Sequence, residues 1–374
     1  MEVPSKPLKI LQLTSGLDVN GALVHCKLLS QQLARRGHQV TIACRQQSWL
    51  WSQFSELPVR VVTCQMNRWP LSDLTEFAEW MKREQFDVMH SHMSSAHMFG
   101  IIMKKMTGIP VVATAHCRHV QPWWRFNDTV IANSASTYRF HKKFNLVPSQ
   151  QLVTIHPFID TQKFREPARP MYRAMRRDWR FPMDASVLAI AGDVVPHKGH
   201  HWLFKCLPDL LQAFPELRVI LVGRFRRGES YTNRLRQHLV DHQLYKRVKW
   251  LGRRNNMQDV LGAADLVVMP SLVEAFGMVA LESMAVGTPV VASETGGLKE
   301  LITHRQNGLL VPPRNAPLLG GAITRLLTDP TLRTQIIQGG LQTIQERFTP
   351  EVLTRQIETV LYSATQSEKK RLAA

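Results

Sequence analysis

The sequence predicts an α/β protein built from two Rossmann-like domains with parallel sheets that face each other across an interdomain cleft. Short β-branched runs alternate with helix-length segments, the pattern of βαβ units. The alternation extends over 374 residues, enough for two domains. It is interrupted once, by a segment rich in proline and arginine at Phe158–Asp184. We therefore predict domains at 1–165 and 166–349, and a final helix at about 350–366 that can pack back on the first domain.

The first half begins with a strand and a helix. The helix is expected at Ala22–Arg35, because Cys26, Leu29 and Leu33 recur at helical spacing and Gly37 provides a stop. Further β-branched runs follow at regular intervals. The strands expected in this half cover residues 9–14, 38–44, 59–64, 86–91, 109–115, 129–133 and 152–157.

The second half repeats the alternation with more continuous Val/Ile/Leu runs, typical of strands covered by helices on both faces. Its last helix is expected to begin near Pro350, with Thr349 as the N-cap. Ligands of open parallel sheets bind beyond the carboxyl ends of the strands, so two such sheets predict a site in the cleft. The strands expected here cover residues 187–192, 217–222, 248–251, 265–270, 289–292 and 309–311.

Composition favours an ordinary soluble protein, with 44% hydrophobic and 20% charged residues. The longest apolar stretch, Gly100–Ala115, is broken by two lysines and is too short to span a bilayer. Ile10–Leu13 is too brief for the core of a signal peptide. Five cysteines without CxxC spacing argue against a disulfide framework or zinc site. We expect a cytoplasmic protein.

The unusual feature is charge, because Lys plus Arg exceed Asp plus Glu by 47 − 29 = 18. Such an excess indicates partners rather than fold. Nucleic acid, an anionic membrane surface and phosphorylated substrates are the candidates.

The most informative segment runs from Asp265 to Ser293. A buried strand ends at Pro270, a loop follows, and a helix opens near Phe276 and Gly277. Glycine there lets a ligand approach the backbone. The free N–H groups of the next two residues, Met278 and Val279, together with the helix dipole, suit a diphosphate.

Two glutamates, Glu274 and Glu282, flank this helix start. Eight helical residues separate them by about 12 Å along the axis, whereas the carboxylates of a retaining glycosidase lie about 5 Å apart. They are therefore poorly placed as a hydrolytic pair and better placed to bind hydroxyls at opposite ends of an elongated ligand. The alternative is one helix cap and one surface glutamate.

Several motifs in this order resemble glycosyltransferase family 4, the retaining enzymes of the GT-B fold. The C-terminal half carries the stronger match and the N-terminal half a moderate one, over residues 9–360. The matching residues are Asn20-Gly21-Ala22, Arg36 to Val40, Thr114-Ala115-His116, Gly192, Lys198-Gly199, Val222-Gly223, Glu274, Glu282, Ala285, Gly287, Pro289-Val290-Val291, Gly296-Gly297, Glu300-Leu301 and Asn307 to Val311.

The resemblance implies a role for each of five residues. Glu282 would bind the donor ribose, Glu274 a hydroxyl of the transferred sugar, and Lys198 the diphosphate as charge builds on the leaving group. Gly21 would let the first loop lie against the phosphates or the acceptor, and His116 would face the sugar from the other domain. Front-face attack with retention needs no enzymic nucleophile.

Two positions depart from the family pattern. Asp193 stands where the family has an arginine that contacts diphosphate, so either it points elsewhere while Arg224 or Arg226 supplies the charge, or it has another role. Pro157-Phe158 replaces an Asn-Gly. No Asp-x-Asp motif occurs, and we predict activity without an obligatory metal.

Taken alone, His116 is more often a structural histidine and Lys198 a solvated lysine. The histidines at 197, 200 and 201 do not indicate a metal site, because no carboxylate or cysteine ligand lies near them at a metal-binding spacing. The register with the family favours the functional interpretation of His116 and Lys198.

Two basic stretches predict a membrane contact. Arg118–Lys143 mixes basic and aromatic residues, and Arg173, Arg176, Arg177 and Arg180 share one face if that segment is helical. The alternative is that the tryptophans are core and the arginines solvated. We expect a peripheral enzyme on the inner face of the cytoplasmic membrane, with a lipid-linked or phosphorylated acceptor.

The leading interpretation is a glycosyltransferase that uses a nucleotide-sugar, UDP- or GDP-linked, in cell-envelope polysaccharide or lipopolysaccharide synthesis. One alternative is a GT-B nucleotide-sugar epimerase. Another is a basic nucleic-acid-binding protein, which gives the two glutamates no role and for which no motif appears.

Overall fold

The computed structural model describes residues 6–54, 58–66, 69–165, 169–225 and 228–372. The chain forms two compact units, each containing one parallel sheet. Unit 1 comprises Met1–Ile159 and Phe348–Ala374, and unit 2 comprises Asp160–Arg347. The division falls at Ile159, within the segment Phe158–Asp184, rather than at residue 165. The two-domain α/β fold expected from the sequence is confirmed.

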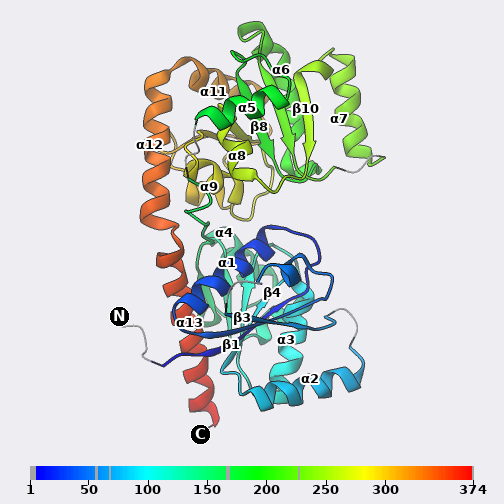
Figure 1. Cartoon of the computed structure of the whole chain (residues 1–374), viewed down its shortest axis with the longest axis vertical. Helices are drawn as coiled ribbons and strands as arrows, with labels where there is room; N and C mark the ends of the chain where they lie inside the picture. The colour runs from blue at the N-terminus through cyan, green and yellow to red at the C-terminus, as the bar shows by residue number, and fades with distance from the viewer. Residues whose placement is uncertain (1–5, 55–57, 67–68, 166–168, 226–227, 373–374) are drawn as a thin grey trace. The chain divides into compact units, whose positions relative to one another are not determined.

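Unit 1 contains a seven-stranded parallel sheet in the order β3-β2-β1-β4-β5-β6-β7 (Figure 1). Side chains alternate between its faces, so Leu11 and Leu13 pack with α2 and α3, while Gln12 and Thr14 belong to the face of α1. The strands are β1 Lys9–Thr14, β2 Gln39–Cys44, β3 Val59–Thr63, β4 Val88–His92, β5 Val111–Ala115, β6 Thr129–Ala132 and β7 Leu152–Thr154; the helices are α1 Gly21–Arg35, α2 Leu71–Glu84, α3 Ser94–Thr107, α4 Ala135–Phe144 and α13 Pro350–Leu372.

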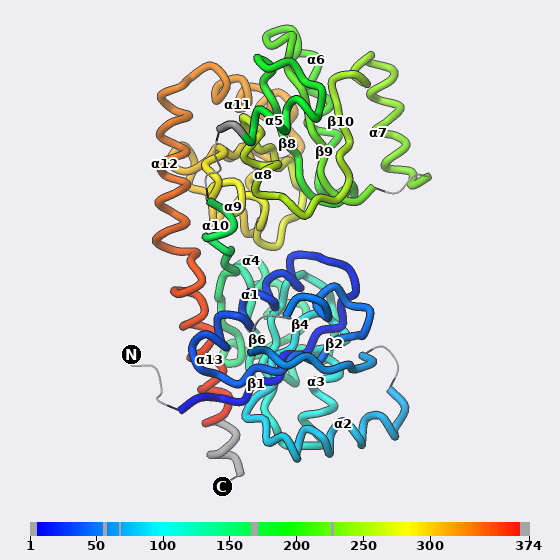
Figure 2. Tube along the Cα trace, in the orientation of Figure 1, coloured from blue at the N-terminus to red at the C-terminus, as the bar shows by residue number. Residues whose placement is uncertain are grey.

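The last helix, α13, returns to unit 1 and lies beside α1 (Figures 1 and 2). Its buried Glu358 binds Arg36 Nη2 at 2.7 Å and His38 Nε2 at 2.6 Å. Leu8 donates its N–H to His38 Nδ1, so Nε2 carries the proton when this histidine is neutral. Tyr362 donates to the carbonyl of Lys6 at 2.6 Å. These contacts tie the two ends of the chain together.

Unit 2 contains a six-stranded parallel sheet in the order β10-β9-β8-β11-β12-β13. One large apolar core packs α6, α7 and α11 against this sheet. The strands are β8 Val187–Ala191, β9 Arg218–Val222, β10 Val248–Gly252, β11 Leu266–Met269, β12 Val290–Ser293 and β13 Leu309–Val311; the helices are α5 Arg169–Asp178, α6 His200–Ala213, α7 Ser230–Asp241, α8 Met257–Gly262, α9 Met278–Ala285, α10 Leu298–Leu301, α11 Ala316–Thr328 and α12 Pro330–Arg347.

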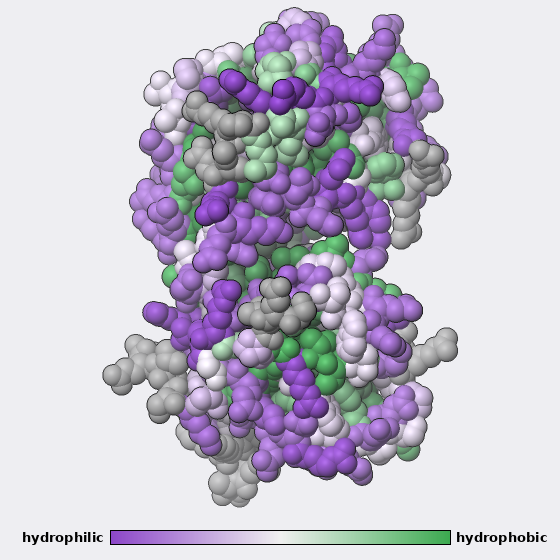
Figure 3. Space-filling view, in the orientation of Figure 1, coloured by the Kyte–Doolittle hydropathy of each residue, from purple (hydrophilic) through white to green (hydrophobic). Residues whose placement is uncertain are grey.

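All thirteen expected strands are present, with ends shifted by up to three residues. The interrupting segment contains a helix, α5, but the expected arginine face is wrong. Arg176 points inward, donates to the Ala263 carbonyl and pairs with Asp265 at 2.9 Å. Arg180 lies beyond the helix at a φ of 56°. Hydrophilic side chains cover most of the visible face of each unit (Figure 3).

Candidate functional site

Lys198 and Glu274, 76 positions apart in the sequence, meet in unit 2. Lys198 ends a 3-10 turn at Pro196–Lys198 after β8, and Glu274 lies in the loop after β11. Lys198 Nζ lies 2.7 Å from Glu274 Oε2, and Ser271 Oγ donates to the same oxygen at 3.3 Å. Their side chains are 22% and 12% exposed, so the pair keeps limited access to solvent. Two predicted site residues therefore lie together beyond the carboxyl ends of neighbouring strands.

Glycines make room for this lysine. Gly192 has a φ of +134°, and a Cβ there would lie 3.5 Å from Lys198 Cε. A Cβ on Gly223 would lie 2.0 Å from the Gly192 carbonyl oxygen, and one on Gly199 would lie 2.0 Å from that of Pro270. The approaches at Gly223 and Gly199 are possible only without side chains, whereas at Gly192 the positive φ is what favours glycine. The turns at Gly192 and Gly223 pack closely against each other, and Lys198 lies beside Gly192.

A second glycine pair holds the Glu274 loop. Gly296 has a φ of +51°, and a Cβ there would lie 1.7 Å from the Glu274 carbonyl oxygen. Gly297 donates its N–H to the same carbonyl at 3.3 Å, and its own Cβ would lie 2.5 Å from Phe276 Cα. The sequence showed these glycines only as family motif; their physical role is close backbone packing.

The N-terminus of α9 lies directly after this loop. Gly277, at a φ of +114°, is its N-cap, and Phe276 before it is buried. The Gly277 carbonyl accepts from Ala280 and Leu281. The N–H groups of Met278 and Val279 have no acceptor within the described residues. They suit an anion.

Glu282 lies in α9, partly buried. Burial raises the pKa of its carboxyl to about 7, against the opposing positive charge of Lys163. A carboxyl poised between protonation states at neutral pH needs hydrogen-bond donors to hold its charge. Hydroxyl groups of a ligand would serve, and no described side chain does.

Asp193 forms an ion pair with Arg224. The Arg224 N–H donates to Asp193 Oδ1 at 3.1 Å, and the guanidinium Nη2 donates to Oδ2 at 3.0 Å. The structure thus pairs Asp193 with Arg224, one of the two arginines that the sequence offers as a source of positive charge for a diphosphate. Arg226 lies outside the described residues.

In unit 1, His116 follows β5 and belongs to a polar group on the α1 face of the sheet. His92 Nδ1 lies 3.0 Å from His116 Nε2, and His92 Nε2 lies 2.9 Å from Gln12 Oε1. His25 of α1 packs edge-on against His116, with 5.4 Å between ring centroids. His90 lies 4.3 Å from His92 by ring centroids. We call His25, His90, His92 and His116 the histidine cluster.

Burial keeps the histidine cluster uncharged. It lowers the pKa of His25 to about 4 and that of His90 to about 3. For His92 and His116, burial and the neighbouring imidazoles hold the pKa well below the usual value. Sequence reasoning found only His116. The missed signal was polar residues alternating along two adjacent strands, which places Gln12 beside His90 and Thr14 beside His92.

The remaining predicted features are placed as follows. Gly21 is the exposed first residue of α1, and the Asn20 side chain caps the helix by accepting from Ala22 and Leu23. His200 is buried, and His201 Nδ1 lies 3.0 Å from the Tyr231 hydroxyl. Across the described ranges no three His, Cys, Asp or Glu side chains are grouped to hold a metal.

The basic and aromatic stretch Arg118–Lys143 is divided between core and surface. Trp124 is 1% exposed and packs in a core cluster with Tyr138 against it, which corrects the prediction for these two rings. Phe126 remains 54% exposed beside Arg125. None of the helices formed by described residues has the length and apolar character needed to cross a membrane.

Two parallel α/β units, one carrying glycine turns around a lysine and an acidic loop, match the architecture of GT-B glycosyltransferases. Sequence comparison places the chain more narrowly: residues 171–343 match the family "Glycosyl transferases group 1", and residues 19–163 match "Glycosyltransferase Family 4". The chain belongs to glycosyltransferase family 4, as the motifs predicted.

Curated relatives agree with this assignment, and a solved structure shares the fold. The N-acetyl-alpha-D-glucosaminyl L-malate synthase of Bacillus anthracis is 25% identical over 94% of this chain and 96% of its own length. The D-inositol 3-phosphate glycosyltransferase of Corynebacterium efficiens is 26% identical over 76% and 73%. Anabaena HepE, solved with UDP and glucose, superimposes with a TM-score of 0.83 at 24% identity over 95% of this chain and 100% of that one.

Proposed function

We propose that this chain is a retaining glycosyltransferase that transfers a sugar from a UDP- or GDP-sugar to a glycan, glycolipid or lipid-linked acceptor in cell-envelope polysaccharide synthesis. The observation that carries the proposal is the Lys198–Glu274 pair, held by glycine turns next to the start of α9. The solved complexes of HepE with UDP and UDP-glucose support a nucleotide-sugar donor. WaaG, at 14% identity and a TM-score of 0.73 over 94% of this chain and 99% of that one, shares the fold.

Different residues of unit 2 bind different parts of the donor. The N–H groups of Met278 and Val279 bind the diphosphate, and Lys198 leaves Glu274 to neutralise the charge that builds on it. Glu274, freed from the lysine, accepts a hydrogen bond from a sugar hydroxyl. Glu282 accepts from the ribose hydroxyls, which favour its charged form.

In the transfer, the bond between the anomeric carbon and the phosphate oxygen breaks, and a bond from that carbon to the acceptor oxygen forms. The acceptor proton passes to the departing phosphate oxygen, and the nucleoside diphosphate leaves. The proposal includes His116 as a neutral imidazole that contacts the sugar.

Nucleotide-sugar binding tests the proposal directly. Thermal shift with UDP-, GDP- and ADP-sugars should show one nucleotide that stabilises the chain, by roughly 2.7 kcal/mol at a hundredfold excess over Kd. Lys198→Ala should weaken that shift. Conversion of the nucleotide-sugar into one that carries an altered sugar, without an acceptor and without net release of nucleotide, would instead indicate the epimerase.

We also propose activity without an obligatory divalent ion. Turnover should persist in EDTA. Complete loss of activity that added Mg²⁺ or Mn²⁺ restores would refute this part.

The membrane part of the proposal rests on the +18 charge and on exposed aromatic and basic side chains of unit 1. Phe144, 52% exposed, lies beside Lys143, and Leu146 is 65% exposed. Such a surface suits an anionic leaflet. Flotation should recover the chain with phosphatidylglycerol vesicles and not with phosphatidylcholine vesicles; equal absence from both would contradict it.

A further inference from the structure

Unit 1 contains a cavity of about 610 Å³ between the edge strand β3 and helix α2. That size lies within the range of about 300–1,000 Å³ typical of small-molecule sites. All of its lining residues belong to unit 1, from the end of β2 through α2 and α3. It involves none of the residues assigned above to the donor or the histidine cluster. We call it the β3–α2 groove.

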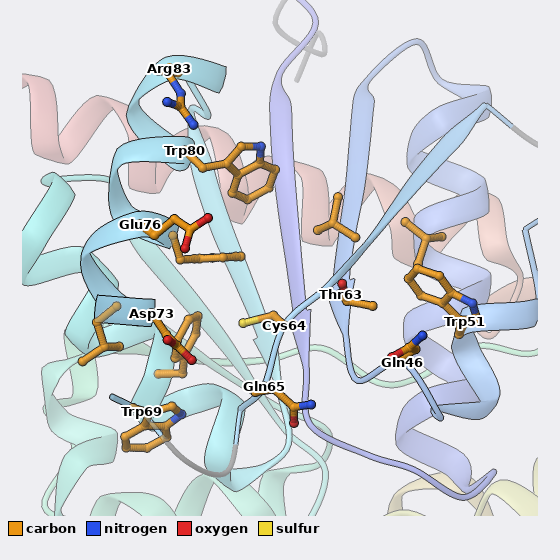
Figure 4. Close-up of a pocket in the computed structure, with 15 residues that line it drawn as sticks. Gln46, Trp51, Thr63, Cys64, Gln65, Trp69, Asp73, Glu76, Trp80 and Arg83 are labelled. Atoms are coloured by element: carbon orange, nitrogen blue, oxygen red, sulfur yellow. The ribbon is translucent and has the colours of Figure 1, made fainter. Parts of the chain in front are cut away.

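Its floor is a continuous row of aromatic rings. Phe99 lies 6.2 Å from Trp69 and 5.3 Å from Phe77 by ring centroids. Phe77 in turn lies 4.9 Å from Trp80. A third lining tryptophan, Trp51, is 40% exposed on the opposite side (Figure 4). Flat apolar faces therefore lie along the length of the groove.

The walls are polar. Asp73, Glu76 and Arg83 extend from α2, while Gln46 and Gln65 line the groove from the segments that follow β2 and β3 (Figure 4). Among described residues, the side chains of Glu76 and the two glutamines have no hydrogen-bond partner, and neither has the buried indole Nε1 of Trp69. The groove thus combines aromatic faces with unused donors and acceptors.

This chemistry selects its ligand. An acyl chain would bury the carboxylates without compensation, which is costly. An anion would face two carboxylates, Asp73 and Glu76, against one guanidinium. A neutral saccharide presents apolar C–H faces for the tryptophans and hydroxyls that both donate and accept. We infer that the β3–α2 groove binds a neutral oligosaccharide chain, as a second carbohydrate site independent of the donor site.

Titration with neutral trisaccharides tests this on the full chain. Maltotriose, cellotriose, mannotriose and chitotriose are probed by saturation-transfer NMR and tryptophan fluorescence. At least one should bind, with a Kd on the order of 1 mM. Trp51→Ala and Glu76→Gln should each weaken that binding by about fivefold or more, whereas Tyr245→Ala, at a 69% exposed ring in unit 2, should not.

Lys198→Ala should retain the trisaccharide binding, which separates this inference from the proposed transferase function. Binding that Lys198→Ala abolishes would place the saccharide at the donor site instead. The inference is overturned if no trisaccharide binds, if both groove variants bind as the parent does, or if only lauric acid saturates the groove.

Discussion

Lys198 Nζ lies 2.7 Å from Glu274 Oε2, so two side chains assigned to different parts of a donor bind each other. The ion pair holds both groups in a defined position before a ligand arrives. In the proposed function, a diphosphate would compete with Glu274 for the ammonium group, and a sugar hydroxyl would replace the ammonium group at the carboxylate.

Lys198→Ala tests the electrostatic half of this arrangement. Removing a preorganised positive charge from the leaving group should lower kcat by about 100-fold or more. The matched control is Lys246→Ala, an exposed lysine of the same unit, which should retain parental kcat. Equal activity of both variants in a donor-turnover assay would contradict the role of Lys198.

Glu282→Gln tests the raised pKa of a carboxyl. A folded-state pKa near 7, above an ordinary value of 4.5, means that folding favours the protonated form. The stability that the protonated Glu282 carboxyl contributes to the folded chain is fully present below about pH 4.5. It is lost as the pH rises through 7, where the carboxyl ionises in the folded state. Glutamine cannot ionise, so the variant does not lose stability in this pH range. Its free energy of unfolding should exceed that of the parent by at most about 3 kcal/mol at pH 8 and equal it at pH 4.5. Urea unfolding measures both, with the exposed Glu346→Gln as control.

Gly296→Ala tests the packing of the acidic loop. The added Cβ would lie 1.7 Å from the Glu274 carbonyl oxygen. This distance is far too short for atoms that are not bonded, so the loop must move. We expect a loss of more than about 2 kcal/mol in the free energy of unfolding, together with loss of nucleotide binding. Gly252→Ala has a φ of +70° and open space, and should cost only about 1 kcal/mol of backbone strain. Similar losses in the two variants would argue against the close approach.

Glu358→Ala tests how α13 is held in unit 1. The change leaves the buried His38 and the partly buried Arg36 without their carboxylate. Breaking a buried pair in this way costs about 3–5 kcal/mol. Glu351→Ala, at an exposed position of the same helix, should cost less than about 0.5 kcal/mol in the same denaturation experiment.

The histidine cluster predicts sensitivity to acid. Its members have folded-state pKa values below the ordinary 6.5, so the unfolded chain binds more protons as pH falls. Stability should therefore drop below about pH 6.5, by up to about 5 kcal/mol per pH unit for four histidines. His25→Phe should reduce this slope, and the exposed His119→Gln should not. A flat stability between pH 7 and pH 5 would contradict the prediction.

Motifs in the sequence predicted part of the candidate site. Lys198 and Glu274 were identified by their place in a family pattern, and the structure brings them into contact. Whether Arg224 or Arg226 replaces the family's arginine at the diphosphate was left open, and the contact of Arg224 with Asp193 was not foreseen, because a spacing of about thirty residues does not show which side chains meet. His92 and Gln12 were missed, since each lies in a strand that looks like ordinary core when taken alone.

The sequence by itself determined the two parallel sheets, because a strand covered on both faces must be apolar throughout and such runs are visible without coordinates. Only the tertiary structure decided which distant groups meet: Glu358 with His38, His92 with His116, and the rings of the β3–α2 groove. Local periodicity reports the face on which a residue lies. Which residues of other elements contact that face depends on the order of the strands in the sheet, and this order is set only in the folded chain.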